Sequence, residues 1–202
     1  MLKVIKATDY RRMPWKNGQG ETIEIAVSPN NANWNNFEWR VSMAQITQSG
    51  PFSVFPDVDR TLLVLSGGQI KLSTGSRKST LLMPGSEPYS FAGEEETKAI
   101  LTGDSVIDLN VMTHRQRFTH EMKRVHLQGR ESLIGQKNRW HMIVVVNGSL
   151  SVEWEDRLTR VGPMDSLLSD QAMNLTAVQA TDLVLITLQS LMDVTAGSSV
   201  NP

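Results

Sequence analysis

PFSVFPDVDRTLLVLSGG, from Pro51 to Gly68, is the most informative segment of the 202-residue sequence. Its apolar run, from Arg60 to Ser66, ends at a glycine pair, Gly67–Gly68, and the chain then continues at Gln69. A short apolar run bounded by turn residues is typical of a buried β-strand, and consecutive glycines supply the positive φ angles of a tight turn. We therefore predict a β-hairpin that turns at the glycine pair.

A second segment repeats this design roughly 80 residues further along the chain. An apolar run from Trp140 to Val146 is interrupted by Asn147–Gly148, and it resumes from Ser149 to Trp154. Asn-Gly is the strongest two-residue signal for a β-hairpin. Pro84–Gly85 follows the first predicted hairpin much as Gly162–Pro163 follows the second. The repetition indicates an internal duplication.

Strand signals predominate along the rest of the chain. Apolar and polar residues alternate from Thr22 to Val27 and again from Phe37 to Met43, which predicts two half-buried strands. Helical periodicity is scarce, and Gly, Pro, Asn and Asp separate many short apolar runs. This pattern favours an all-β sandwich or barrel over a βαβ sheet.

The duplication predicts two barrel-like halves. We expect an N-terminal half at residues 1–115, a C-terminal half at residues 116–195 and a disordered tail at residues 196–202. The polar, basic segment HRQRFTH lies at the expected boundary, between Thr113 and Glu121. Such a segment is also compatible with a loop inside one body, and the length of the chain suits either arrangement.

Composition narrows the classes of function. The formal net charge is −1, which disfavours nucleic acid and anionic membranes as partners, because both attract clusters of Lys and Arg. The chain has no Cys, which excludes a thiolate nucleophile, a disulfide framework and thiolate-bound metals. No apolar run approaches the ~20 residues of a transmembrane helix, and the first residues lack a signal-peptide pattern. We expect a cytoplasmic protein, monomeric or homodimeric, whose partner is a small molecule or a protein.

The segment Met13–Glu24, MPWKNGQGETIE, is the densest cluster of unusual residues. Its predicted turn gathers the ring of Trp15, the ammonium of Lys16 and the amide of Asn17 beside backbone amides that could contact a ligand. The alternative is a loop that enters a strand, with Trp15 covering the core.

Five polar side chains and one methionine on single strand faces complete the candidate ligand-binding site. They are Arg40, Ser42, Arg60, Asp108, Asn110 and Met112. An inward-facing Arg40 suits a carboxylate, because its planar guanidinium donates two parallel hydrogen bonds. If that face points outward, Arg40 is a solvated surface charge instead. Asp108 would stay ionised near two guanidiniums, and the alternative is a structural ion pair between Asp108 and Arg60.

A set of metal ligands is missing from the pattern. His114, His120 and His126 are spaced by six residues, which separates them along a strand and scatters them around a helix. With His141, we interpret them as ordinary surface or core histidines. No G-x-S-x-G elbow supports a hydrolase triad. The sequence predicts neither a metal nor another cofactor.

The informative segment resembles the first cupin motif, in which a His-x-His pair and a Glu precede an apolar strand that ends at Gly. Aligned on that strand, the two His positions fall on Val54 and Pro56, and the Glu position falls on Arg60. No His follows Pro84–Gly85 or Gly162–Pro163, near which the second motif would place one. The resemblance implies a bicupin, two cupin-like antiparallel β-barrel or jelly-roll halves packed together, without the metal ligands.

Five segments taken together resemble the HutD/Ves family, in order and over roughly residues 10–115: PWKNGQGETIEIAV, FEWRVSMAQI, GPFSVFPDVDRTLLVLSGG, FAG and DLNVM. The resemblance implies a metal-free bicupin and, in some members, a regulatory or ligand-binding role in histidine utilisation. The Ves branch is associated with cold and stress responses, and no established catalytic activity comes with the family. Gln19 and Asp57 stand where the family commonly has glycine, and Gln19 adds an amide beside the expected pocket.

Three functions remain open from the sequence. The favoured one is a regulatory protein that binds a small carboxylate such as N-formyl- or N-formiminoglutamate, because arginine and amide side chains suit anions and amides. A metal-independent isomerase or hydrolase would use Lys16 or Asp108 as general base. A protein-interaction module would expose an apolar patch that contains Trp15 or Trp34.

Overall fold

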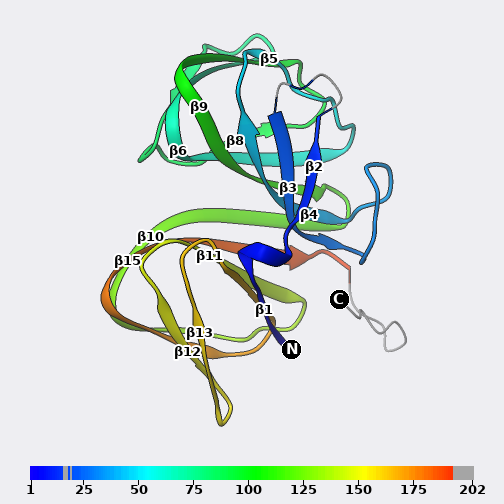
Figure 1. The fold of residues 1–202 in the computed structure, drawn as a ribbon. Helices are drawn as coiled ribbons and strands as arrows, with labels where there is room; N and C mark the ends of the chain where they lie inside the picture. The colour runs from blue at the N-terminus through cyan, green and yellow to red at the C-terminus, as the bar shows by residue number, and fades with distance from the viewer. Residues whose placement is uncertain (16–17, 19, 193–202) are drawn as a thin grey trace. The chain divides into compact units, whose positions relative to one another are not determined.

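The computed structural model describes residues 1–15, 18 and 20–192, which lie almost entirely in β-strands and the turns between them (Figure 1). This part of the chain contains one short 3-10 helix, η1 (Ala7–Asp9), and no α-helix. The prediction of an all-β protein is confirmed. No helix in the described part has the length and apolar character that crossing a membrane requires.

The strands form two compact units. The N-terminal unit, Arg11–Arg117, holds an eight-stranded sheet of β2 (Arg11–Pro14), β3 (Gly20–Ser28), β4 (Trp39–Ile46), β5 (Gly50–Pro51), β6 (Val58–Thr74), β7 (Thr80–Leu82), β8 (Tyr89–Ala92) and β9 (Thr97–His114). The C-terminal unit holds a seven-stranded sheet of β1 (Leu2–Ile5), β10 (Phe118–Leu133), β11 (Arg139–Asn147), β12 (Leu150–Trp154), β13 (Arg157–Val161), β14 (Ser166–Ser169) and β15 (Met173–Ser190).

The observed division differs from the expected one at the start of the chain. Residues Met1–Tyr10 belong to the C-terminal unit, because β1 pairs with β14 and places Leu2 opposite Ser169. The chain passes from the N-terminal to the C-terminal unit between Arg117 and Phe118, inside the predicted boundary segment. The tail predicted at residues 196–202 lies outside the described residues.

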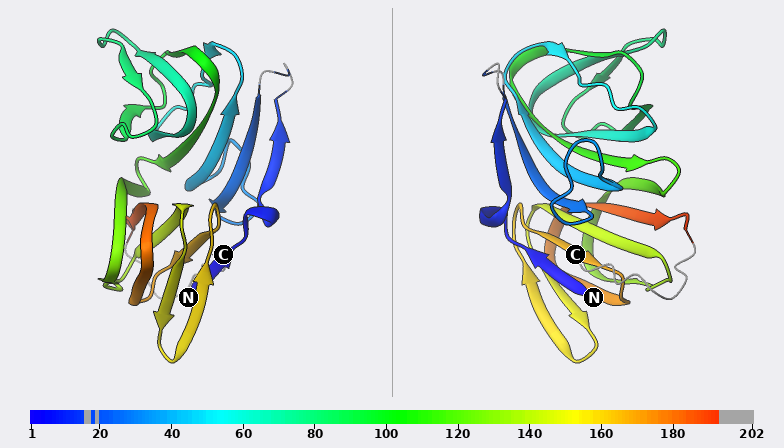
Figure 2. Two further views of the ribbon diagram at one scale, coloured as in Figure 1. Left: turned by 60° about the vertical axis from the view of Figure 1, so that its left-hand side comes forward. Right: turned by 90° about the vertical axis from the view of Figure 1, so that its right-hand side faces the viewer.

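Two long, curved strands, β6 and β9, run through the N-terminal unit (Figure 2) and contribute much of its core. Its sheet has the order β2-β3-β4-β9-β6-β7, with β5 added to β9 and β8 added to β6. Alternate residues of β6 and one of β9 are fully buried and pack together: Leu62, Val64, Ile70, Leu72 and Val106. Their period of two along β6 is the alternation that one buried face of a strand requires.

The hairpin predicted at Gly67–Gly68 is wrong. Strand β6 runs through both glycines and pairs with β9 on either side of them, from Val58 opposite His114 to Thr74 opposite Thr97. Gly67 has φ +94°, and a Cβ atom there would lie 2.0 Å from the carbonyl oxygen of Ser105. The glycine therefore allows β9 to approach a bulged, bent strand, and the strand does not reverse.

The hairpin predicted at Asn147–Gly148 is wrong for the same reason. Strands β11 and β12 do not pair with each other, because both pair with the single long strand β15. A Cβ atom on Gly148 would lie 2.5 Å from Oγ1 of Thr181 in β15. In each unit, then, a glycine lies where a long strand comes into close contact with a bent stretch of its partner. The pairing of β6 with β9 is repeated in the pairing of β11 and β12 with β15, which agrees with the internal duplication.

Candidate functional site

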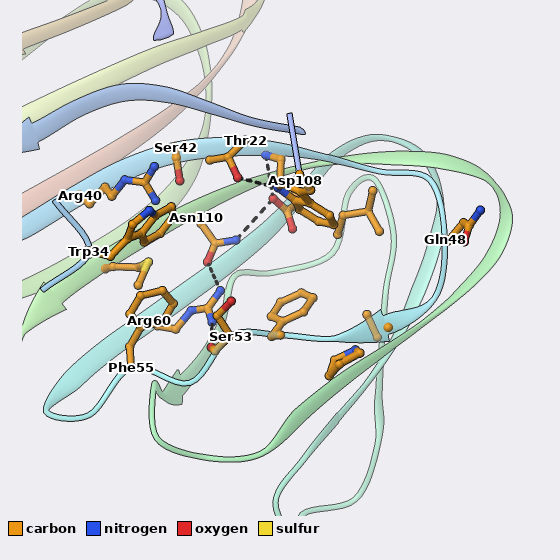
Figure 3. Close-up of a pocket in the computed structure, with 18 residues that line it drawn as sticks. Thr22, Trp34, Arg40, Ser42, Gln48, Ser53, Phe55, Arg60, Asp108 and Asn110 are labelled. Atoms are coloured by element: carbon orange, nitrogen blue, oxygen red, sulfur yellow. Dashed lines mark hydrogen bonds between the residues drawn. The ribbon is translucent and has the colours of Figure 1, made fainter. Parts of the chain in front are cut away.

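A cavity of about 420 Å³ lies within the N-terminal unit, lined mainly by residues of β3, β4, β6 and β9 and of the segment around β5 (Figure 3). Small-molecule sites in proteins have volumes of about 300–1,000 Å³. Aromatic and aliphatic side chains form much of the wall. The described lining residues with an ionisable side chain are Arg40, Arg60 and Asp108.

The register of three adjacent strands sets the order of the polar residues. Arg40 of β4 and Arg60 of β6 are both paired with Met112 of β9, so the two arginines lie on either side of it, with Cα atoms roughly 10 Å apart. The next inward-facing position of β9 is Asn110, opposite Ser42 of β4. Arg40 and Ser42 therefore face the cavity, and the alternative of a solvated surface Arg40 is wrong.

Asp108 occupies the following inward position of β9 and is 1% exposed. Its Oδ1 accepts hydrogen bonds from the backbone N–H of Ala44 at 3.2 Å and from the side-chain amide of Asn110 at 3.4 Å. Its Oδ2 is buried and has no hydrogen-bond partner among the described residues. Burial raises the pKa of Asp108 from 3.8 to about 7, against the opposing effects of the Arg60 charge and these hydrogen bonds.

Arg60 is 7% exposed, and its two hydrogen bonds leave one of its three guanidinium nitrogens without a partner among the described residues. Nη1 donates to the carbonyl oxygen of Ser53 at 3.3 Å, and Nη2 donates to Oδ1 of Asn110 at 3.1 Å. Nε is buried and has no partner among the described residues. No ion pair formed in the described part of the chain includes Arg60. A buried guanidinium whose two hydrogen-bond partners are neutral still has an uncompensated charge that an anion would neutralise.

Three aromatic rings hold Arg60 in place. The rings of Phe91, Phe52 and Phe55 have centroids 5.0, 5.1 and 5.7 Å from the guanidinium carbon. Burial lowers the pKa of Arg60 to about 10, while Asp108 acts in the opposite direction. The side chain therefore keeps its positive charge at neutral pH in an apolar surrounding, where its interaction with an anion is strong.

Arg40 differs from Arg60 because it already has a carboxylate partner. Its Nε donates to Oε2 of Glu24 at 2.7 Å, and its guanidinium lies 3.9 Å from the centroid of the Trp34 ring. Burial lowers the pKa of Arg40, and the hydrogen bond and charge of Glu24 counteract this change. Arg40 is thus a paired, stacked cation at the side of the cavity.

Asn110 lies between Arg60 and Asp108, as Figure 3 shows. It accepts from the guanidinium with its oxygen and donates to the carboxylate with its nitrogen. The alternative of a direct structural ion pair between Asp108 and Arg60 is therefore wrong. The amide bridges the two charged groups, and one polar atom of each, Nε and Oδ2, has no partner among the described residues.

The cavity collects most of the residues that the sequence marks as ligand-binding. Arg40, Ser42, Arg60, Asp108, Asn110 and Met112 all line it, and so does Trp15, whose Nε1 donates to Oγ1 of Thr22 at 2.9 Å. Lys16 and Asn17 lie outside the described residues. That the lining residues bind a ligand stays a prediction.

Sequence reasoning missed the aromatic part of the wall. Phe52 and Phe55 belong to the segment from Pro51 to Gly68 and lie near Arg60. Trp34 stacks on Arg40, and its ring centroid lies 5.6 Å from that of Phe55. Glu24, which pairs with Arg40, was also missed as a partner. Aromatic residues beside the expected strand were the available signal, but only the fold reveals which of them meet.

The described residues do not fit a metal ion. They contain no group of three or more His, Asp or Glu side chains placed to bind one. Two of the aligned cupin ligand positions carry Val54, which is exposed, and Pro56, and the third carries the cationic Arg60. A guanidinium in place of a carboxylate repels a cation. Among the histidines, His126 pairs with Asp182 at the surface and His141 is buried in the C-terminal unit.

Sequence comparison connects the chain with two kinds of relative. The family model HutD matches residues 7–186. Protein Ves from Citrobacter koseri is 42% identical over 113 residues, which are 54% of this chain and 58% of that protein. An uncharacterised 21.2 kDa protein in the hutC 3' region of Pseudomonas putida is 37% identical over 117 residues, 58% of this chain and 60% of that protein. The matches thus span about three-fifths of the length of these curated relatives.

Solved structures extend the similarity to almost the whole chain. A conserved protein of unknown function from Pseudomonas aeruginosa PAO1 has a TM-score of 0.86, 26% identity and coverage of 94% of this chain and 100% of its own. HutD from Pseudomonas fluorescens SBW25, in a structure from a formate condition, has a TM-score of 0.80 and 26% identity, and the match covers 95% of this chain and 100% of that one. YhhW from Escherichia coli, a bacterial pirin, has a TM-score of 0.69 at 13% identity, and the match covers 96% of this chain and 99% of that one. The fold is that of a bicupin, as predicted.

Proposed function

The chain belongs to the HutD family, and we propose that it binds a small carboxylate in the cavity around Arg60. The observation that carries this proposal is the state of Arg60. Its guanidinium is buried, lines the cavity and has two neutral hydrogen-bond partners but no anionic one among the described residues. Buried charges in proteins are ordinarily paired, because an unpaired one loses its hydration without compensation. A ligand carboxylate supplies the partner that the described chain does not.

The rest of the wall favours a carboxylate whose body carries an amide or formyl group. Asn110 and Ser42 lie next to Arg60 and Arg40 and offer both donors and acceptors. We propose N-formyl- or N-formiminoglutamate as the ligand class. The relative in the hutC 3' region and the HutD structure from a formate condition support this choice.

We propose a regulatory role in histidine utilisation or in a stress response, carried out in the cytoplasm. The lining residues that the structure describes include no His and no Glu, and Asp108 is the acid–base group among them. A cavity with one buried carboxyl group and two arginines suits recognition of an anion better than a sequence of proton transfers.

A second candidate is a metal-independent enzyme that uses Asp108 as general base. A pKa of about 7 suits a general base at neutral pH, and the carboxyl group lines the cavity. Substrate turnover with histidine-degradation intermediates, compared between the wild type and Asp108→Asn, distinguishes the two candidates. Equal and negligible rates leave the binding function, and a rate that only the wild type has supports the enzyme.

Calorimetric titration tests the binding function. We expect heat with formate, N-formylglutamate or N-formiminoglutamate, and we expect Arg60→Gln to weaken binding by about 10- to 100-fold, the effect of losing charged hydrogen bonds. Arg77→Gln is the matched control, because Arg77 is an exposed arginine of the same unit that pairs with Glu95. The proposal is wrong if millimolar ligand gives no heat, or if Arg60→Gln binds as tightly as the wild type.

A further inference from the structure

We infer that the cavity takes up its carboxylate together with one proton, which Asp108 holds. This inference rests on the proposed binding function and adds the charge state of the site. It follows from how the charges around the cavity are paired and from the polar atoms that have no partner.

The charges of the site are balanced before a ligand arrives if Asp108 is ionised. Arg40 and Glu24 neutralise each other at 2.7 Å. Arg60 and an ionised Asp108 then form a second, indirect couple through Asn110. An entering carboxylate would leave the site with an excess negative charge, which is costly because Arg40, Arg60 and Asp108 are themselves buried. A proton on Asp108 restores the balance and leaves Arg60 to the ligand.

The second oxygen of Asp108 favours the protonated form, although the two hydrogen bonds to the first oxygen favour the ionised one. Oδ1 already accepts two hydrogen bonds, from Ala44 and Asn110, while Oδ2 has no partner among the described residues. A buried carboxylate oxygen without a donor is unfavourable, and protonation removes the charge that burial penalises.

The charged groups that surround Asp108 can be named from each strand packed around it. Arg60 faces it from β6, Arg40 comes from β4, and Glu24 of β3 lies behind Arg40 as its ion-pair partner. Burial raises the pKa of Asp108 to about 7, and Arg60 is the main charge that lowers it. A carboxylate bound to Arg60 cancels that opposing charge and raises the pKa further, so binding above neutral pH must draw a proton from solution.

The pH dependence of formate binding measures this coupling. For the wild-type chain we expect a dissociation constant that is constant below about pH 6 and rises about tenfold per pH unit from about pH 7.5 upward. Titrations at about pH 8 in Hepes and in Tris, whose ionisation enthalpies differ, should give an uptake of about one proton per formate.

Two variants separate Asp108 from other titrating groups. Asp108→Asn resembles the protonated form, so we expect it to bind formate with little pH dependence and, at about pH 8.5, about tenfold or more tighter than the wild type. Asp104→Asn makes the same change at an exposed position of the same strand, β9, and should keep the wild-type profile.

The outcomes distinguish this inference from the binding function beneath it. Formate binding that is equally tight from about pH 6 to 9, without proton uptake, overturns the inference and leaves the binding function. The absence of binding for formate, N-formylglutamate and N-formiminoglutamate at every pH overturns both. The wild-type pH series and proton count decide the question even if Asp108→Asn does not fold.

Discussion

Arg60 and Asp108 are buried and line the same cavity without forming an ion pair, and the amide of Asn110 is hydrogen-bonded to both of them. Each residue keeps one polar atom, Nε and Oδ2, without a partner among the described residues. In a direct ion pair, each group would neutralise the charge of the other, and no positive charge would be left for a ligand. Their separation leaves Arg60 without an anionic partner among the described residues, which is what the proposed carboxylate site requires.

Asn110 should contribute to stability through both of its hydrogen bonds. Asn110→Leu leaves Arg60 and Asp108 each with one partner fewer in a buried setting, so we expect the free energy of unfolding to fall by about 1–3 kcal/mol. Urea unfolding, monitored by circular dichroism, measures this change in the free energy of unfolding. The control is Asn35→Leu, at an exposed loop position, where we expect less than about 0.5 kcal/mol. An equal loss in both variants would contradict the role of Asn110.

Stability should depend on pH through Asp108. The pKa of this group is 3.8 as an ordinary Asp and about 7 in the folded chain, so the folded protein holds the proton more tightly than the unfolded chain. Unfolding between these values releases a proton, and the free energy of unfolding falls as the pH rises through that window. Asp108→Asn cannot ionise and lacks this fall.

The measurement is urea unfolding of the wild type and Asp108→Asn across that pH range. We expect the variant to gain on the wild type as the pH rises from about 4 to 8, by up to about 1.4 kcal/mol for each unit by which the pKa is raised. Asp104→Asn, at an exposed position, should show no such gain. A constant difference between wild type and Asp108→Asn would place the pKa of Asp108 near its ordinary value.

Gly67 should be far more sensitive to substitution than another glycine with the same backbone conformation. Gly67 and Gly85 have φ +94° and +93°, but a new Cβ meets the carbonyl oxygen of Ser105 at 2.0 Å in the first case and nothing within 4 Å in the second. Gly85→Ala should cost about 1–2 kcal/mol for its backbone conformation. Gly67→Ala should cost several kcal/mol more, or prevent folding, in thermal unfolding experiments. Similar losses in the two variants would show that the approach of β9 is not the constraint.

Trp34 should affect ligand binding more than stability. It is 48% exposed and stacks on Arg40 at 3.9 Å, an interaction worth about 0.5–1 kcal/mol at such a site. Trp34→Ala should therefore weaken formate binding by about two- to fivefold with a small change in unfolding temperature, and Trp34→Phe should keep most of the affinity. Calorimetric titration with formate checks both variants. A large loss of stability in Trp34→Ala would assign the ring to the core instead.

The sequence by itself determined the elements that depend on local pattern. Period-two alternation predicted β3 and most of β4, the repeated apolar runs predicted two related β units, and the lack of metal ligands at Val54 and Pro56 followed from residue type alone. Side-chain alternation within one strand also placed Asp108, Asn110 and Met112 on one face. These properties require no knowledge of what packs against the strand.

The tertiary structure decided everything that depends on a facing strand. The same glycine pair is compatible with a hairpin or with a bent strand, and only the close approach of β9 selects the second. Likewise, Arg40, Arg60 and Asp108 come from three strands whose register is set by long-range pairing. The sequence alone therefore could not show that they line one cavity, or that Asn110 lies between Arg60 and Asp108. Pairing with distant partners likewise places β1 in the C-terminal unit.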